Sequence, residues 1–182
     1  IPKLAPYLLL FFGFFMIKEG RELIQKAQMP WWSLGYVVII PLALTVFYSR
    51  FYPYLILFVF VCIWSSDSFA FLIGRAIGRT PLAPKISPKK TVEGLIGGIV
   101  LTLIVGYFYN ALIPFHDIDN TMIISGVIAL VAPLGDLWIS SIKRSAGVKD
   151  SGVFLPGHGG ALDRLDSFLT AGPVALILYL IL

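Results

Sequence analysis

The chain has 182 residues, of which 58% are hydrophobic and 13% charged, whereas soluble domains average about 45–50% apolar and about 25% charged residues. This composition excludes a soluble globular domain, a disordered chain and a nucleic-acid-binding module. The net charge is +4, and the single cysteine, Cys62, excludes a disulfide within this chain and a cysteine-based metal cluster. Because the chain begins at Ile1 and ends within an apolar run, we expect it to be the C-terminal part of a longer membrane protein.

Six apolar stretches are long enough, or nearly so, to cross a bilayer core about 30 Å thick as helices. The first and the last are short, which favours truncated or tilted helices. No stretch alternates with the period of two residues that is typical of a membrane barrel. We therefore predict an all-α polytopic membrane protein, built as a bundle of about six transmembrane helices. The predicted spans cover residues 4–17, 31–48, 53–73, 95–115, 121–142 and 167–182.

The basic residues are concentrated in alternate connections between these spans. Segments 18–30, 74–94 and 143–166 hold all of the 14 Lys and Arg residues except Lys3 and Arg50. Since Lys and Arg accumulate on the cytoplasmic side, these three segments are predicted to face the cytoplasm. The first has charges of both signs at helical spacing, which indicates a solvated or interfacial helix. The other two are long connections without apolar periodicity, and we predict that both are functional cytoplasmic loops.

Two acidic residues lie inside predicted spans, each about six residues from the cytoplasmic end. Asp67 lies in the third span and Asp136 in the fifth, which places both roughly 9 Å below the same membrane face. A carboxylate at this depth is costly unless it faces a bundle interior, water or a cation. Asp163 and Asp166 precede the last span at the same level. The four carboxylates are therefore predicted to converge, and oxygen-only ligation favours a hard cation such as Mg²⁺.

Other interpretations of these residues stay open at this point. Asp166 is followed by Ser167 and could cap the last helix. Asp67 could form a buried ion pair with Arg75. The Lys, Arg, hydroxyl and glycine residues of segment 74–94 could bind a substrate phosphate or the headgroups of anionic lipids.

The second long loop ends in a glycine-rich turn that leads into an acidic and basic run. Glycines around a histidine, in Pro156-Gly157-His158-Gly159-Gly160, let the backbone approach a ligand closely. With Ser140-Ser141-Ile142-Lys143-Arg144, Lys149-Asp150 and Asp163-Arg164-Leu165-Asp166, this turn resembles the CDP-diacylglycerol synthase (phosphatidate cytidylyltransferase) family. Segments 67–71 and 86–94 look like the same family. The resemblance covers a catalytic core at about residues 67–166, and we expect one membrane-embedded catalytic domain over residues 1–182.

The resemblance implies transfer of the cytidylyl group of CTP to phosphatidate, which gives CDP-diacylglycerol and pyrophosphate. It implies Mg²⁺ as a cofactor, CTP, phosphatidate and membrane lipid as partners, a homodimer, and a cell (inner) membrane location with the active site facing the cytoplasm. The number of acids also suggests a second, monovalent cation in the site. The implied metal ligands are Asp136, Asp163 and Asp166, and the implied catalytic residues are Asp67, Lys143, Arg144, Lys149, Asp150, His158 and Arg164. The implied substrate-binding residues are Ser68, Arg75, Arg79, Ser87, Lys89, Lys90, Glu93 and Ser140.

Two other functions compete with this interpretation. A CTP-dependent polyprenol or lipid-alcohol kinase would move the γ-phosphoryl group instead, but the complete run from Lys143 to Asp166 argues against it. An ion-coupled membrane transporter predicts acids spread across the depth of the bilayer, whereas the four acids here cluster near one face.

Overall fold

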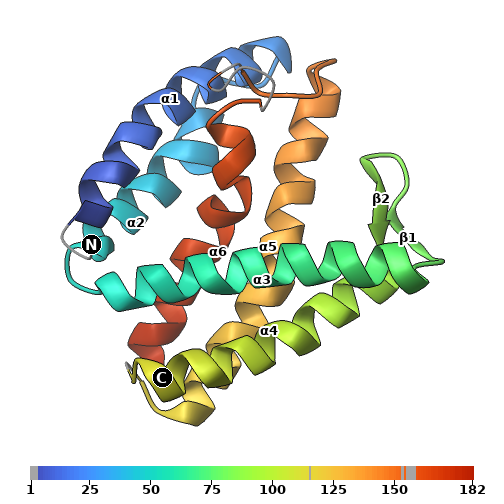
Figure 1. Ribbon diagram of the computed structural model, residues 1–182. Helices are drawn as coiled ribbons and strands as arrows, with labels where there is room; N and C mark the ends of the chain where they lie inside the picture. Colours follow the sequence, from blue (N-terminus) through green and yellow to red (C-terminus); the bar gives the residue numbers. More distant parts are fainter. Residues whose placement is uncertain (1–3, 115, 153, 155–158) are drawn as a thin grey trace.

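The computed structural model describes residues 4–114, 116–152, 154 and 159–182, and most of them are helical (Figure 1). A short antiparallel hairpin interrupts the helices between α3 and α4, which departs from the all-α prediction. The cause is local, because Pro81, Pro84 and Pro88 lack the N–H that a continued helix needs. The elements are α1 (Ala5–Lys26), η2 (Gly35–Ile39), α2 (Ile40–Ser49), α3 (Pro53–Ile77), β1 (Pro81–Ala83), β2 (Ser87–Thr91), α4 (Val92–Leu112), α5 (Ile118–Ser145) and α6 (Leu162–Ile181).

Within the described residues, four helices are long and apolar enough to cross a membrane, where six spans were predicted. These four are α3, α4, α5 and α6. The second predicted span is a shorter apolar helix, Gly35–Ser49, whose 15 residues at about 1.5 Å each fall short of a bilayer core. The first predicted span is one half of α1, which continues as a single helix through the charged residues to Lys26.

The helix ends also correct the predicted extents of the two long loops. α3 continues to Ile77 and α5 to Ser145, so both loops begin later than predicted. α6 begins at Leu162, so Asp163, Arg164 and Asp166 lie in its first two turns and not in the preceding loop.

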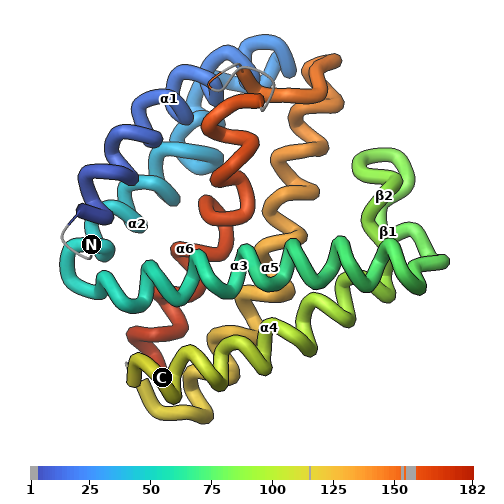
Figure 2. Tube along the Cα trace, viewed as in Figure 1, coloured from blue at the N-terminus to red at the C-terminus, as the bar shows by residue number. Residues whose placement is uncertain are grey.

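The four long helices form two antiparallel pairs. α3 packs along α4, and α5 packs along α6, and the second pair crosses the first (Figures 1 and 2). The hydrophobic core joins α3, α5 and α6 around Phe58, Ile128 and Phe168. A second apolar cluster, which includes Met16 and Leu162, joins α1 and α2 to α5 and α6.

Glycines of α4 allow it to approach α3 closely. A Cβ atom at Gly94 would lie 2.5 Å from the Ala70 carbonyl oxygen, and one at Gly98 would lie 2.9 Å from the Ser66 carbonyl oxygen. These glycines therefore serve the packing of two helices of the same chain.

Pro133 interrupts the hydrogen bonding of α5 and fixes α3 against it. Because Pro133 has no N–H, the Ala129 carbonyl loses the donor that normally lies four residues further along the helix. The buried Ser66 hydroxyl on α3 donates to this carbonyl at 3.2 Å. This contact joins the two helices one residue from Asp67 on α3 and seven residues, about two turns, from Asp136 on α5.

Candidate functional site

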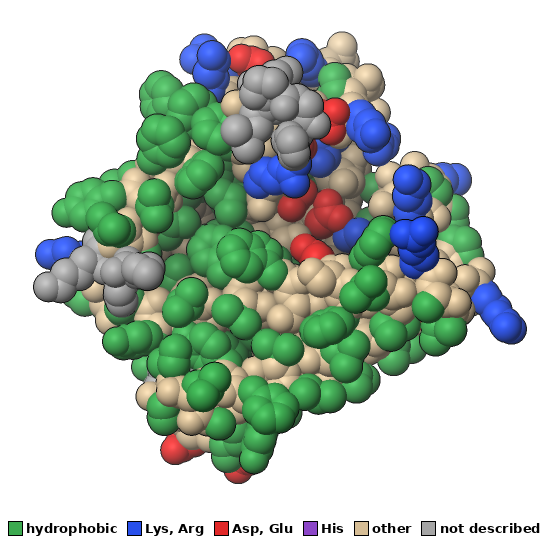
Figure 3. Space-filling model, in the orientation of Figure 1, with side chains coloured by type: hydrophobic (Ala, Val, Ile, Leu, Met, Phe, Trp, Pro, Cys, Tyr) green, Lys and Arg blue, Asp and Glu red, His purple; other side chains and the backbone are tan. Residues whose placement is uncertain are grey.

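A cavity of about 450 Å³ lies among α3, α5, α6 and the hairpin. The space-filling view shows acidic and basic side chains gathered in a hollow, with hydrophobic side chains over much of the surrounding surface (Figure 3). The structure thus brings the four carboxylates to one cavity, as their shared depth predicts. The charged lining residues are Asp67, Asp136, Asp163, Asp166, Lys89, Lys90 and Arg164, and the apolar lining includes Phe60, Trp64, Phe71, Leu82, Leu95 and Phe168.

Asp136 on α5 forms an ion pair with Lys90 of the hairpin. Both side chains are about one quarter exposed, at 27% and 26%. The Ser140 hydroxyl, one turn further along α5, donates to Asp136 Oδ1 at 3.3 Å. This pair connects segment 74–94 to the acidic residues of the cavity wall. Lys90 therefore contacts an acid and also faces the cavity.

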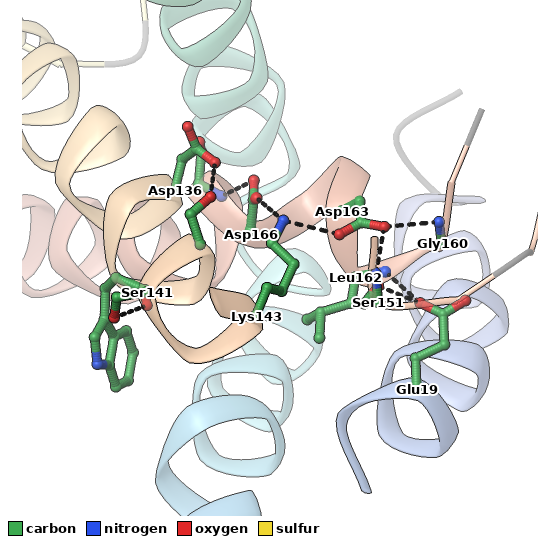
Figure 4. A network of polar contacts seen from close by, with 12 residues as sticks. Glu19, Asp136, Ser141, Lys143, Ser151, Gly160, Leu162, Asp163 and Asp166 are labelled. Carbon is green, nitrogen blue, oxygen red and sulfur yellow. Dashed lines mark hydrogen bonds and ion pairs between the residues drawn. The ribbon is translucent and has the colours of Figure 1, made fainter. Parts of the chain in front are cut away.

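Lys143 is buried behind the acids. Its Nζ lies 2.9 Å from Asp163 Oδ1 and 3.9 Å from Asp166 Oδ2 (Figure 4). Lys143 is 7% exposed and is not among the residues that line the cavity. Its charge balances two carboxylates from inside the protein.

Asp163 connects the segment before α6 to the site. Its Oδ2 accepts hydrogen bonds from the Ser151 N–H at 2.8 Å and from the Gly160 N–H at 2.9 Å. The turn at Gly159 has φ of +86°, a conformation that favours glycine. Since Oδ1 pairs with Lys143, both oxygens of Asp163 have donors from this chain (Figure 4).

Glu19 on α1 is the residue that the sequence interpretation missed. It is 7% exposed and accepts hydrogen bonds from the Ser151 hydroxyl and from the N–H groups of Ala161 and Leu162. The prediction of a solvated or interfacial helix over 18–30 is therefore wrong for this residue. The sequence does carry a signal for its burial. Apolar residues such as Leu9, Met16 and Leu23 recur at helical spacing, and Glu19 lies on the same face of the helix. The buried residues of α1 are Pro6, Leu9, Gly13, Met16, Glu19, Gly20, Leu23 and Ile24.

These contacts decide how the N-terminus of α6 is capped. The N-cap residue, Ala161, has no side-chain acceptor, and Glu19 takes the first N–H groups of the helix instead. Asp166 accepts only from the N–H of its neighbour Ser167, at 2.7 Å, among the described hydrogen bonds. The alternative in which Asp166 caps the last helix is therefore wrong.

Glu93 holds the hairpin to the end of α3. Its carboxylate accepts from the N–H groups of Arg79 and Thr80 at 3.1 Å each and from the Thr80 hydroxyl at 2.8 Å. Thr91 caps α4 by accepting from the Gly94 N–H at 3.1 Å. In this structure Glu93 and Thr91 therefore stabilise the fold of segment 74–94.

Most of the remaining predicted site residues do not line the cavity, and one lies outside the described residues. Arg144 donates to the Val148 carbonyl at 3.1 Å. Among the described residues, Asp67 forms no ion pair with Arg75, which is exposed. His158 lies outside the described residues. The described candidates that do not line the cavity are Ser68, Arg75, Arg79, Ser87, Glu93, Ser140, Lys143, Arg144, Lys149 and Asp150.

Two of the acids fit a divalent cation at the cavity. Asp136 and Asp166 both line the cavity, and like charges that share one site favour a proton or a cation between them. Mg²⁺ commonly uses one or two protein carboxylates and takes its other oxygens from water and substrate phosphates. In the described part of the chain, no three Asp, Glu, His or Cys side chains are arranged to hold one metal ion. The donor set therefore fits a site that substrate oxygens complete.

Comparison with known proteins gives one consistent family. A model of the cytidylyltransferase family matches residues 3–182. Phosphatidate cytidylyltransferase of Rickettsia typhi is 38% identical over 178 residues, which cover 92% of this chain and 77% of that protein. The enzymes of the same name from Haemophilus influenzae and Staphylococcus saprophyticus are 43% and 45% identical over 125 and 124 residues. These matches cover 66% and 68% of this chain, but only 43% and 48% of those two relatives.

Proposed function

This chain belongs to the cytidylyltransferase family, and we propose that it transfers the cytidylyl group of CTP to phosphatidate. The products are CDP-diacylglycerol and pyrophosphate. The observation that carries this proposal is the composition of the cavity wall, which joins four carboxylates and three basic residues to an apolar surface. A phospholipid needs both kinds of wall, because its phosphate and its acyl chains are parts of one molecule.

The chemistry requires charge stabilisation more than a strong base. An ionised phosphatidate oxygen attacks the α-phosphorus of CTP, and the bond from that phosphorus to the bridging oxygen of the β-phosphate breaks. Negative charge then grows on the pyrophosphate that leaves. Lys89 and Arg164 face the cavity and supply fixed positive charge for phosphate oxygens.

We propose Mg²⁺ as the cofactor, with Asp136 and Asp166 as its protein ligands and Asp67 facing the same cavity. When bound, Mg²⁺ would neutralise charge on the triphosphate and on the leaving pyrophosphate. We assign Asp163 a different role, because its Oδ2 accepts from two backbone N–H groups and its Oδ1 pairs with the buried Lys143. The partners of Asp136, by contrast, are side chains. Asp163 holds Lys143 and the segment before α6 in place.

We propose that the charged end of the molecule faces the cytoplasm from an inner membrane. The argument is the concentration of Lys and Arg in segments 18–30, 74–94 and 143–166. Single cysteines at positions 85 and 149, on a Cys62→Ser background, should resist an impermeant thiol reagent in intact cells and react after lysis. Ready labelling of either position in intact cells would overturn this orientation.

The decisive experiment follows the label of CTP into lipid. We expect α-³²P to enter the lipid fraction when the purified protein in detergent is given phosphatidate, CTP and Mg²⁺, and we expect γ-³²P to stay in the aqueous phase as pyrophosphate. Asp136→Asn is the control that should remove this transfer. Entry of the γ-label into lipid would instead indicate a kinase, and absence of both labels from lipid would refute the transferase.

A further inference from the structure

Glu19 lies outside the cavity but contacts the start of α6, which supplies Asp163, Arg164 and Asp166 to the cavity lining, and the connection that precedes it. Its Oε1 accepts from the Ala161 N–H at 3.0 Å, and its Oε2 accepts from the Leu162 N–H at 2.8 Å and the Ser151 hydroxyl at 3.1 Å. The donors belong to the connection before α6 and to the start of α6. One carboxylate from α1 therefore joins this helix to a region of the chain that lies 132 to 143 residues away.

We infer that Glu19 is a positioning residue for the proposed cytidylyl transfer, which this inference presupposes. It acts through Ser151 and Asp163 and does not touch the substrates. Ser151 is shared between the two acids, because its hydroxyl donates to Glu19 and its N–H donates to Asp163. Asp163 in turn pairs with Lys143, which also lies beside Asp166. The contacts of Glu19 thus continue, one side chain at a time, to the wall of the cavity.

The surroundings of Glu19 suit a carboxylate specifically. The start of α6 presents N–H groups and the positive end of the helix dipole, and its N-cap residue offers no acceptor. Two glycines leave space for the acid: a Cβ atom at Gly152 would lie 2.7 Å from Glu19 Oε1, and one at Gly160 would also collide with the carboxylate. A glutamine here would turn an NH₂ group, which is a donor, toward donors.

Loss of the carboxylate should shift the start of α6 rather than unfold the molecule. The apolar cluster that contains Met16, Leu23 and Leu162 would still hold α1 against α6. In Glu19→Gln the amide keeps one accepting oxygen, so one of the two N–H groups, of Ala161 or of Leu162, would lose its acceptor while buried, which favours movement toward water. Asp163 follows Leu162 directly, so its contacts to Ser151 and Lys143 would change with that movement.

The test compares Glu19→Gln with Glu22→Gln, which makes the same chemical change at an exposed position on the same helix. Amide hydrogen exchange would be measured on both full-chain variants in detergent. For Glu19→Gln we expect exchange to rise by about tenfold or more in peptides that contain Ser151 and residues 160–162, with α3 and α4 unchanged. Steady-state kinetics should show kcat reduced by about tenfold or more, with KM for CTP and phosphatidate within about twofold of wild type. Glu22→Gln should match wild type in both measurements.

Each outcome decides the inference. Faster exchange throughout all helices would mean that Glu19 contributes only general stability, and unchanged exchange at residues 160–162 or unchanged kcat would remove the positioning role. Failure of the proposed function is distinguishable, because wild-type protein would then transfer no cytidylyl group while the local exchange difference between the two variants would persist.

Discussion

The two long connections of the site differ in charge and in how they are held in place. The hairpin connection, residues 78–91, holds four basic residues, whereas the connection between α5 and α6, residues 146–161, holds Lys149 and Asp150. The hairpin between α3 and α4 pairs β1 with β2 and is closed by Glu93, which lies 13 and 14 residues from its partners. The connection between α5 and α6 is held by Asp163 and by Glu19, whose partners lie 132 to 143 residues away. The hairpin is therefore held by contacts that are local in sequence, whereas the connection between α5 and α6 depends on α1, at the other end of the chain.

This difference separates two roles for acids near the cavity. Asp136 is about one quarter exposed and faces the cavity, so it is available to a ligand. Asp163 is about 10% exposed, pairs with the buried Lys143 and accepts from two backbone N–H groups. Loss of Asp163 should therefore reduce stability as well as activity, whereas loss of Asp136 should reduce activity alone. Variants at both positions test this difference.

The largest effect is expected from Asp163→Asn. The variant leaves the buried Lys143 without its nearest carboxylate and replaces an acceptor of two N–H groups. Breaking a buried ion pair from one side costs about 3–5 kcal/mol, so we expect a lower free energy of unfolding together with loss of activity. Denaturant unfolding in mixed micelles measures this cost. Asp119→Asn, an exposed acid at the other end of α5, is the control and should change the stability by less than about 1 kcal/mol.

Asp136→Asn should separate activity from stability. Its pair with Lys90 is partly exposed, and such pairs contribute about 0–1 kcal/mol. The proposed metal ligation is lost, however, and we expect cytidylyl transfer to fall by about a hundredfold or more while the melting temperature stays near that of wild type. Parallel activity and melting measurements on this variant and Asp163→Asn would check the distinction. A matching loss of stability in both variants would mean that both acids serve the fold.

The sequence predicts the parts of this site that depend on helical periodicity and membrane cost. The convergence of Asp67 and Asp136 follows from their depth, because a carboxylate within an apolar span needs a polar cavity. The role of Glu19 does not follow from its neighbours in sequence, because its partners lie on α6 and become neighbours only when α1 packs there. The hairpin was missed for another reason: a three-residue and a five-residue strand carry too little alternation to be recognised.

A moderate effect is expected from Glu93→Gln in the hairpin. The β1–β2 pairing remains, and only the contacts to Arg79 and Thr80 weaken. We expect faster amide exchange at these two residues, unchanged exchange within the paired strands, and a decrease in kcat of about two- to threefold. Thr80→Val, which removes the single hydroxyl donor, should have a smaller effect in the same direction. Loss of strand protection in Glu93→Gln would show that the hairpin also depends on contacts beyond its own backbone.

The smallest effects are expected from single lysine variants, which test whether the hairpin and the connection between α5 and α6 contact different substrates. Lys89 is exposed and lines the cavity beside Leu82 and Phe71, where a lipid can present its phosphate next to its hydrocarbon chains. Lys89→Ala should therefore raise KM for phosphatidate by about three- to tenfold and change KM for CTP by less than about twofold. Lys85→Ala removes the same charge from the hairpin turn, at an exposed residue that does not line the cavity, and should leave both constants near wild type.

Lys149→Ala provides the complementary arm of that comparison. Lys149 lies in the connection that Glu19 and Asp163 hold beside α6, and by its resemblance to the family it is expected to act on CTP or on the leaving pyrophosphate. The variant should raise KM for CTP, or lower kcat if the contact forms only as pyrophosphate leaves, with KM for phosphatidate unchanged. Kinetics with each substrate varied in turn, at fixed mole fraction of lipid in detergent, would measure all three variants. An equal response to Lys85→Ala and Lys89→Ala would indicate general attraction of anionic lipid to the hairpin, and a Lys89→Ala variant impaired only toward CTP would reverse the assignment of the two connections.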